Sequence, residues 1–136
     1  GCGAQYFSQQ AVGRLLHPAG IKLPDELDLP EKLLEVQSLM AKEDPRARSI
    51  YETIGTYLGY SLAHYSDFYA VENVLLLGRV TSGNGGTVIL EKATEVLMSA
   101  FPELEEKLNF HIPDEQEKRH GQAIAAATLP SLRSQA

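Results

Sequence analysis

Apolar residues recur every three or four positions over most of the chain, the spacing that buries one face of a helix. Ser8 can cap the first of these helices, and Asp44 followed by Pro45 is a strong start signal for the third. The predicted helices cover residues 9–17, 30–40, 45–65, 87–100 and 121–129, with one or two further turns between 102 and 108.

Two short runs of residues break this pattern and are predicted as strands. Residues 73–77 are too few for a helix, and their apolar character is typical of a strand buried on both faces, as in a parallel sheet. Residues 109–112 form the second run, which Pro113 ends. Because two strands do not make a stable sheet alone, we expect further strands from sequence outside this chain. Residues 1–136 are therefore predicted as a single α/β domain.

The segment between the first strand and the next helix is rich in glycine, with Gly78, Gly83, Gly85 and Gly86. Backbone without Cβ atoms can approach a ligand closely, and free N–H groups at a helix start suit a phosphate. The segment matches neither a P-loop nor a dinucleotide fingerprint, and a turn that binds nothing is the alternative. Arg79 is either a phosphate or adenine contact or a surface ion-pair partner.

Gly55 and Gly59 lie four positions apart in the third predicted helix. Each glycine costs a helix about 1 kcal/mol relative to alanine. We therefore expect this helix to approach a sheet or a ligand closely at these positions, with simple tolerance of glycine as the alternative.

Composition and charge exclude several classes of protein. The net charge of −6 argues against nucleic acid as the main partner, because phosphate backbones attract a surplus of Lys and Arg. The sequence holds no apolar run long enough for a membrane span and no signal-peptide pattern in residues 1–20. A single cysteine, Cys2, allows no internal disulfide and fits a reducing, cytoplasmic location. The start at Gly1 without a methionine indicates a fragment of a longer chain.

Few residues stand in a pattern that indicates catalysis. None of the four histidines has metal-ligand spacing, and there is no Gly-x-Ser-x-Gly elbow. The sequence does not exclude the alternative that the fold brings a Ser, a His and an Asp together as a catalytic triad. Asp114, Glu115 and Glu117 are typical of a solvated loop.

Four stretches, in this order, resemble the C-terminal half of the ROK family (repressors, open reading frames and sugar kinases). The matches to the family segment Gly-Cys-Leu-Glu-x-Tyr-x-Ser-Gly-x-Ala are Gly1, Cys2, Tyr6, Ser8 and Ala11. Residues 44–48 and 54–63 resemble the family's Gly-Asp-x-x-Ala and Leu-Gly-x-x-Leu-Ala helix, and residues 74–78 resemble the strand before its adenosine-side glycine turn. Residues 121–126 resemble its closing Gly-Ala-Ala-x-x-Ala helix.

The resemblance implies an RNase H-like C-terminal subdomain of the actin-like ATPase superfamily, helix-rich with a small mixed sheet. In such kinases two domains clamp a sugar and ATP with Mg²⁺, and glycine backbone of the C-terminal domain supplies the adenosine pocket. The nucleotide-binding positions carried over to this chain are Gly78, Thr81, Ser82 and Gly83, and Arg79 joins them as the candidate phosphate or adenine contact named above. The helix with Gly55 and Gly59 would lie under the sheet.

Three departures from the family pattern weaken a kinase assignment. Arg79 replaces the second glycine of the turn, so its side chain either fills the adenosine approach or stacks on the base. The family's sugar-contacting Glu falls at Ala4, which removes a sugar hydrogen bond. Cys2 is the only ligand left of the family's zinc site, so we expect no zinc. The phosphate loop and catalytic Asp of the family are not in this sequence, so the isolated chain is predicted to be inactive.

Two functions follow from these observations. The first is the nucleotide-side half of a sugar-kinase-like protein. The second is a non-enzymatic regulator or scaffold that retains the fold for ligand sensing or dimerisation. An unrelated α/β domain is a third alternative. The expected partners are a nucleotide, the missing N-terminal half, which would dock on an exposed apolar sheet face or edge, and a second copy of the chain.

Overall fold

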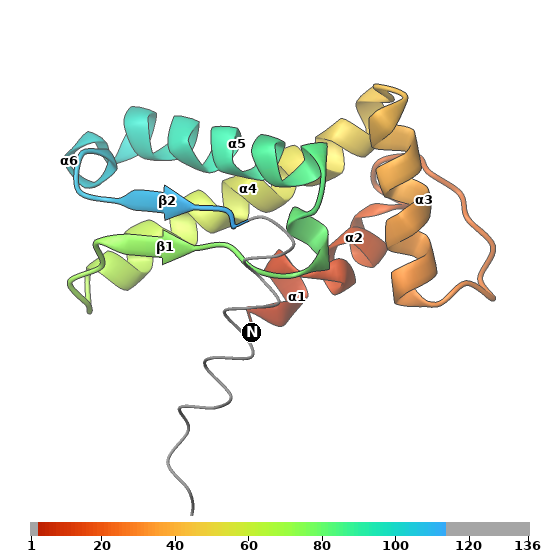
Figure 1. Ribbon diagram of the computed structural model, residues 1–136, viewed down its shortest axis with the longest axis horizontal. Helices are drawn as coiled ribbons and strands as arrows, with labels where there is room; N and C mark the ends of the chain where they lie inside the picture. The colour runs from red at the N-terminus through yellow and green to blue at the C-terminus, as the bar shows by residue number, and fades with distance from the viewer. Residues whose placement is uncertain (1–2, 114–136) are drawn as a thin grey trace, which may run out of the picture.

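The computed structural model describes residues 3–113, in which helices pack on a two-stranded sheet (Figure 1). The helices are α1 (Ala4–Phe7), α2 (Gln9–Leu15), α3 (Leu29–Ala41), α4 (Pro45–Ser66), α5 (Asn84–Ala100) and α6 (Pro102–Glu105), with a 3-10 turn η1 (Arg79–Thr81). The strands are β1 (Asn73–Leu75) and β2 (Asn109–His111). The helix predicted over 121–129 and the acidic run at 114–117 lie outside the described residues.

Helices α4 and α5 run side by side in the same direction and form the centre of the domain (Figure 1). A Cβ atom at Gly55 would lie only 2.6 Å from the carbonyl oxygen of Ile89, and one at Gly59 only 2.8 Å from the Cβ of Val96. The two glycines therefore let the helix axes come close together. The close approach is as predicted, but the partner is another helix rather than a sheet or a ligand.

The strands pair in parallel, with Asn73 opposite Asn109 and Leu75 opposite His111. Together with α5 they make a strand–helix–strand unit, and their inner side chains pack against the core of α4 and α5. The prediction of a strand buried on both faces is wrong, because Leu75 is 57% exposed and Leu77 45%. Within residues 3–113 no element covers this outer face, and the sheet there is parallel rather than mixed. The exposed side of the two strands is only partly apolar, because Leu75 lies there with Asn73, Asn109 and His111, so the expected apolar docking face stays a prediction.

Side-chain caps fix where three of the helices begin. Ser8 Oγ accepts from the backbone N–H of Gln10 at 3.1 Å, and Asp44 Oδ1 accepts from that of Arg46 at 2.9 Å, as the sequence predicts. The start of α3 is a reciprocal capping box that sequence reasoning missed. Asp28 accepts from the Glu31 N–H at 2.9 Å, and Glu31 accepts from the Asp28 N–H at 2.8 Å.

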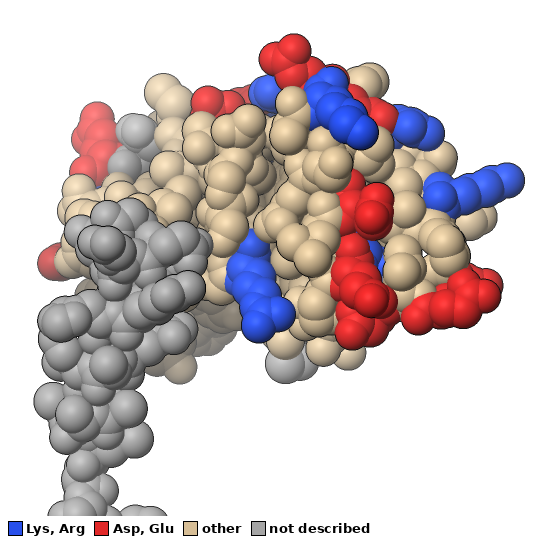
Figure 2. Space-filling model, turned by 45° about the vertical axis from the view of Figure 1, so that its right-hand side comes forward, with Lys and Arg blue, Asp and Glu red and all other residues tan. Residues whose placement is uncertain are grey.

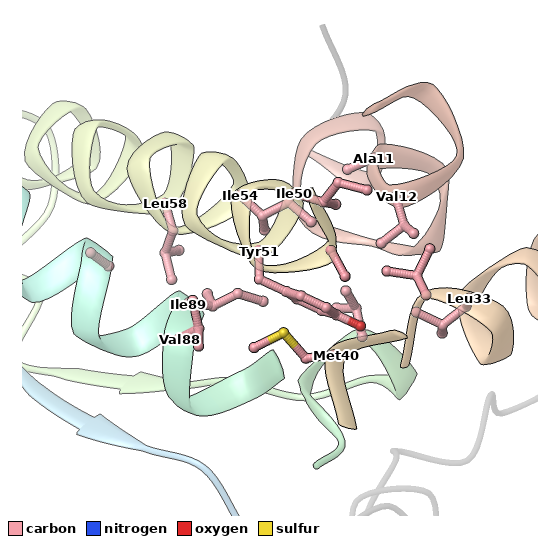
Figure 3. Close-up of a cluster of buried hydrophobic side chains, with 14 of the residues drawn as sticks. Ala11, Val12, Leu33, Met40, Ile50, Tyr51, Ile54, Leu58, Val88 and Ile89 are labelled. Carbon is pink, nitrogen blue, oxygen red and sulfur yellow. The ribbon is translucent and has the colours of Figure 1, made fainter. Parts of the chain in front are cut away.

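One apolar cluster joins four helices, with the ring of Tyr51 at its centre (Figure 3). Its members include Ala11 and Val12 of α2, Leu33 and Met40 of α3, Ile50, Ile54 and Leu58 of α4, and Val88 and Ile89 of α5. This cluster holds the start of α5 against α3 and α4. Among the described residues, no helix combines the length and the apolarity that crossing a membrane requires.

Candidate functional site

The turn from β1 to α5 contains two glycines with positive φ. Gly78 has φ 114° and Gly83 has φ 65°, values that side-chain-bearing residues rarely adopt. A Cβ at either position would meet open space, so both glycines are needed for backbone conformation rather than for room. The conformation of the turn therefore favours glycine at these two positions, and its surface there stays open.

Helix α5 begins at Asn84, earlier than predicted, because Gly85 and Gly86 belong to its first turn. A Cβ at Gly85 would overlap the ring of Tyr51, and one at Gly86 would overlap the carbonyl oxygen of Thr81. These two glycines thus serve packing. No side-chain hydrogen bond caps the N-terminus of α5, and its first turn holds no acidic residue. The positive end of the helix dipole is not offset by a local carboxylate.

Several open hollows border this turn, and two of them contain its positive-φ glycines. The α3–α5 hollow has a volume of about 270 Å³ and is lined by Gln37 and Met40 of α3, Tyr51 of α4, and Ser82, Gly83 and Gly85. The α2 hollow, of about 290 Å³, lies at the other end of the turn and is lined by Ser8, Gln9, Gln10, Gly78 and Arg79. Segments far apart in the sequence, from α2, α3 and α4, therefore border the turn.

The five predicted nucleotide-binding residues lie on one turn but not in one cavity. Ser82 and Gly83 border the α3–α5 hollow, whereas Gly78 and Arg79 border the α2 hollow. Thr81 is 6% exposed, and its Oγ1 donates to the carbonyl oxygen of Gly78 at 2.8 Å. Its side chain lies beneath the turn and shapes it.

The backbone of Arg79 is held by a hydrogen bond, whereas its side chain is exposed to solvent. Nε2 of Gln37 donates to the carbonyl oxygen of Arg79 at 3.1 Å, which ties α3 to the turn. The Arg79 side chain is exposed and makes no ion pair with any described residue. Of the two roles predicted for this residue, the surface ion pair has no partner within residues 3–113.

Tyr51 is the most deeply buried polar side chain of the α3–α5 hollow. It is 0% exposed, and its hydroxyl has no hydrogen-bond partner among residues 3–113. Burial raises the pKa of Tyr51 to about 12, so the hydroxyl stays protonated at neutral pH. Figure 3 shows the side chain reaching from α4 toward α3, with Met40 beside the ring and the hydroxyl at its far end. In the α2 hollow, Oε1 of Gln9 is likewise buried and without a partner.

The described residues that line the two hollows include no carboxylate, and their polar side-chain groups are amides, hydroxyls and one guanidinium. Mg²⁺ takes carboxylate and phosphate oxygens, so the side chains lining these hollows do not make a magnesium site. Across residues 3–113 no group of three or more His, Cys, Asp and Glu side chains is placed to hold a metal ion. The arrangement is suited to binding and orienting a ligand.

The surface charge agrees with the acidic composition. On the face shown in Figure 2, basic side chains of the described residues lie singly or next to acidic ones and form no continuous basic patch. Binding to a nucleic acid backbone needs such a patch, and this face does not supply it.

Sequence reasoning missed Gln37, Met40, Tyr51 and Gln9. They lie on helices, and only the packing of those helices brings them to the turn. Comparison of the chain with protein-family models, curated proteins and solved structures found no match in any of the three.

Proposed function

We propose that this chain is the nucleotide-binding half of a ROK-like, sugar-kinase-like protein with an actin-like fold of the RNase H type, and that the turn from Gly78 to Gly85 is its nucleotide site. The observation that carries the proposal is the pair of hollows at the two ends of one glycine turn. One is lined by the Tyr51 ring and the Gln37 amide, and the other by the exposed guanidinium of Arg79. The sequence resemblance supports Gly78 and Gly83 of this turn as nucleotide-binding positions, whereas Arg79 is a departure from the family pattern.

The α3–α5 hollow suits the base. Its volume of about 270 Å³ is below the roughly 300–1,000 Å³ of pockets that enclose a whole small molecule, so it would take only part of a nucleotide. Met40 and the Tyr51 ring give an apolar wall for a flat heterocycle, and the glycine backbone at Gly83 and Gly85 permits close contact. The N-terminus of α5 then faces electron-rich atoms of the base or the ribose.

The α2 hollow suits the phosphates. Arg79 supplies a planar cation, and guanidinium–phosphate pairs are among the stronger charge-assisted hydrogen bonds. Ser8 and Gln10, from the stretch that resembles the family's sugar-side segment, line the same hollow. A phosphate in this hollow would therefore contact both the segment that resembles the family's sugar side and the proposed nucleotide-binding turn. The start of α5 is thus assigned to the base, not to the phosphate for which the sequence made it a candidate.

The absence of a carboxylate from both hollows favours a binding role for this chain over catalysis by it alone. That observation also fits the second candidate, a regulator that senses a nucleotide without transferring phosphate. Both candidates require the same site, so nucleotide binding is the property to test first.

The test is a thermal-shift titration of the folded chain with ADP, Mg-ATP, adenosine and pyrophosphate. A ligand at 100 times its dissociation constant stabilises by about 2.7 kcal/mol, which raises the melting temperature by several degrees. Arg79→Gln should weaken ADP and pyrophosphate binding roughly tenfold or more and leave adenosine binding unchanged. Arg48→Gln, outside both hollows, is the matched control. No shift with millimolar ADP in a chain shown to be folded by circular dichroism would refute the proposal.

A further inference from the structure

The Tyr51 hydroxyl is not explained by packing. Phenylalanine would fill the same space between α3, α4 and α5 without a polar atom. Buried polar groups in native proteins nearly always have a hydrogen-bond partner, and this one has none. The tyrosine therefore carries an oxygen that the described core does not use.

The position of Tyr51 connects this oxygen to a ligand site. The ring lies against Gly85, where any side chain would overlap it, so α5 begins directly on the ring face. The same ring lines the α3–α5 hollow together with Met40, which is itself 8% exposed. Methionine is flexible and adapts to what it contacts, so a rotation of Met40 would bring the hydroxyl into reach of a ligand in the hollow.

We propose that the Tyr51 hydroxyl donates a hydrogen bond to a ring nitrogen of a purine base held in the α3–α5 hollow. The inference rests on the proposed function. A purine presents ring nitrogens as acceptors at its edge, whereas the ribose and the phosphates do not fit against an apolar wall. The protonated phenol can donate to such a nitrogen, and the hydrogen bond forms away from bulk water, where an unmade one is most unfavourable.

The experiment compares Tyr51→Phe with Tyr60→Phe, a control on the same helix at a side chain that is 54% exposed. The unliganded melting temperature and the dissociation constant for adenosine are measured for both variants and for the natural chain. Tyr51→Phe should melt at the same or a higher temperature, because it removes an unpartnered buried group, yet bind adenosine roughly tenfold more weakly. Tyr60→Phe should change neither quantity.

A second series keeps the test independent of how the variant folds. The natural chain is titrated with 1-deaza-, 3-deaza- and 7-deazaadenosine, each lacking one ring acceptor. One of the three should bind roughly tenfold more weakly than adenosine, and Tyr51→Phe should no longer distinguish that analogue from adenosine. This matched loss identifies the nitrogen that accepts from the hydroxyl.

The outcomes separate the two proposals. If the natural chain binds adenosine and all three analogues equally, or if Tyr51→Phe binds adenosine as well as the natural chain, the role of Tyr51 is refuted and the nucleotide site stands. If Tyr51→Phe loses stability together with affinity, the hydroxyl is structural and the inference fails. If the natural chain binds neither adenosine nor ADP, the proposed function fails, and the inference with it.

Discussion

Replacing Gly55 by alanine tests whether the contact between α4 and α5 depends on glycine. The new Cβ would lie 2.6 Å from the backbone carbonyl oxygen of Ile89 and 2.7 Å from the Cβ of Lys92. The first separation falls 0.8 Å short of the 3.4 Å at which ordinary contact begins. Neither neighbouring atom is the end of a flexible side chain, so the helices themselves must move apart.

Two opposing terms decide the size of the effect. Alanine is favoured over glycine in a helix by about 1 kcal/mol, whereas overpacking a well-packed interior costs about 1–3 kcal/mol. Because the obstruction is backbone, we take the upper part of that range, about 2–3 kcal/mol. Gly55→Ala should therefore lower the free energy of unfolding by about 1–2 kcal/mol, which corresponds to roughly 5–10 °C in melting temperature.

Gly13→Ala is the matched control. It is also a glycine in a helix, α2, but its added Cβ would meet only the Cδ2 end of Leu29, at 2.8 Å. That methyl group can rotate away, so Gly13→Ala should be neutral or stabilising by up to about 1 kcal/mol. Urea unfolding followed by circular dichroism at 222 nm gives both values. If Gly55→Ala stabilises the chain as much as Gly13→Ala, the close approach of the helices does not depend on glycine and the reasoning is refuted.

Two further predictions concern the helix caps. Asp28→Ala removes one side of the reciprocal cap with Glu31 and should cost about 1 kcal/mol in urea unfolding; an unchanged midpoint would contradict the cap. Hydrogen bonds from the Arg46 side chain lower the pKa of Asp44 to about 2, below its ordinary value of 3.8. A lowered folded pKa means that the stabilisation is complete above the ordinary value and is lost as the pH falls from about 4 to about 2. Asp44→Asn should therefore lower the melting temperature at pH 6 more than at pH 2, and an equal loss at both would contradict the pairing.

The elements that could be predicted from sequence are those fixed by local chemistry. Ser8 caps α2 and Asp44 caps α4 through contacts within two residues, which a pattern can reveal. The burial of β1 could not be predicted, because it depends on which element covers each face of the strand. The predicted start of α5 was wrong for a similar reason. Propensity disfavours glycine in a helix, but packing against Tyr51 and Thr81 holds Gly85 and Gly86 in one.

The residues of the candidate site also fall into those that the sequence can reveal and those that only the fold brings together. Gly78 and Gly83 are visible in the sequence because positive φ favours a single residue type. Gln37 is not visible, because its link to the Arg79 carbonyl spans 42 residues and leaves no local signal. Tyr51 is even less visible, since an apolar-looking position in a helical stripe is usually core. Only the lack of a hydrogen-bond partner, which requires coordinates, distinguishes it.

Stability and the proposed ligand binding involve the same face of α4. Tyr51, Gly55 and Gly59 are spaced four residues apart, so they lie on one side of the helix. Gly55 and Gly59 set how closely α5 approaches, and Tyr51 meets the first turn of α5 at Gly85. A change that separates α4 from α5 therefore also shifts the floor of the α3–α5 hollow. Arg79, at the opposite end of the turn and exposed, lies outside that contact. Substitutions there can alter ligand binding without altering the fold, which makes Arg79 the cleaner probe of function and Gly55 the cleaner probe of packing.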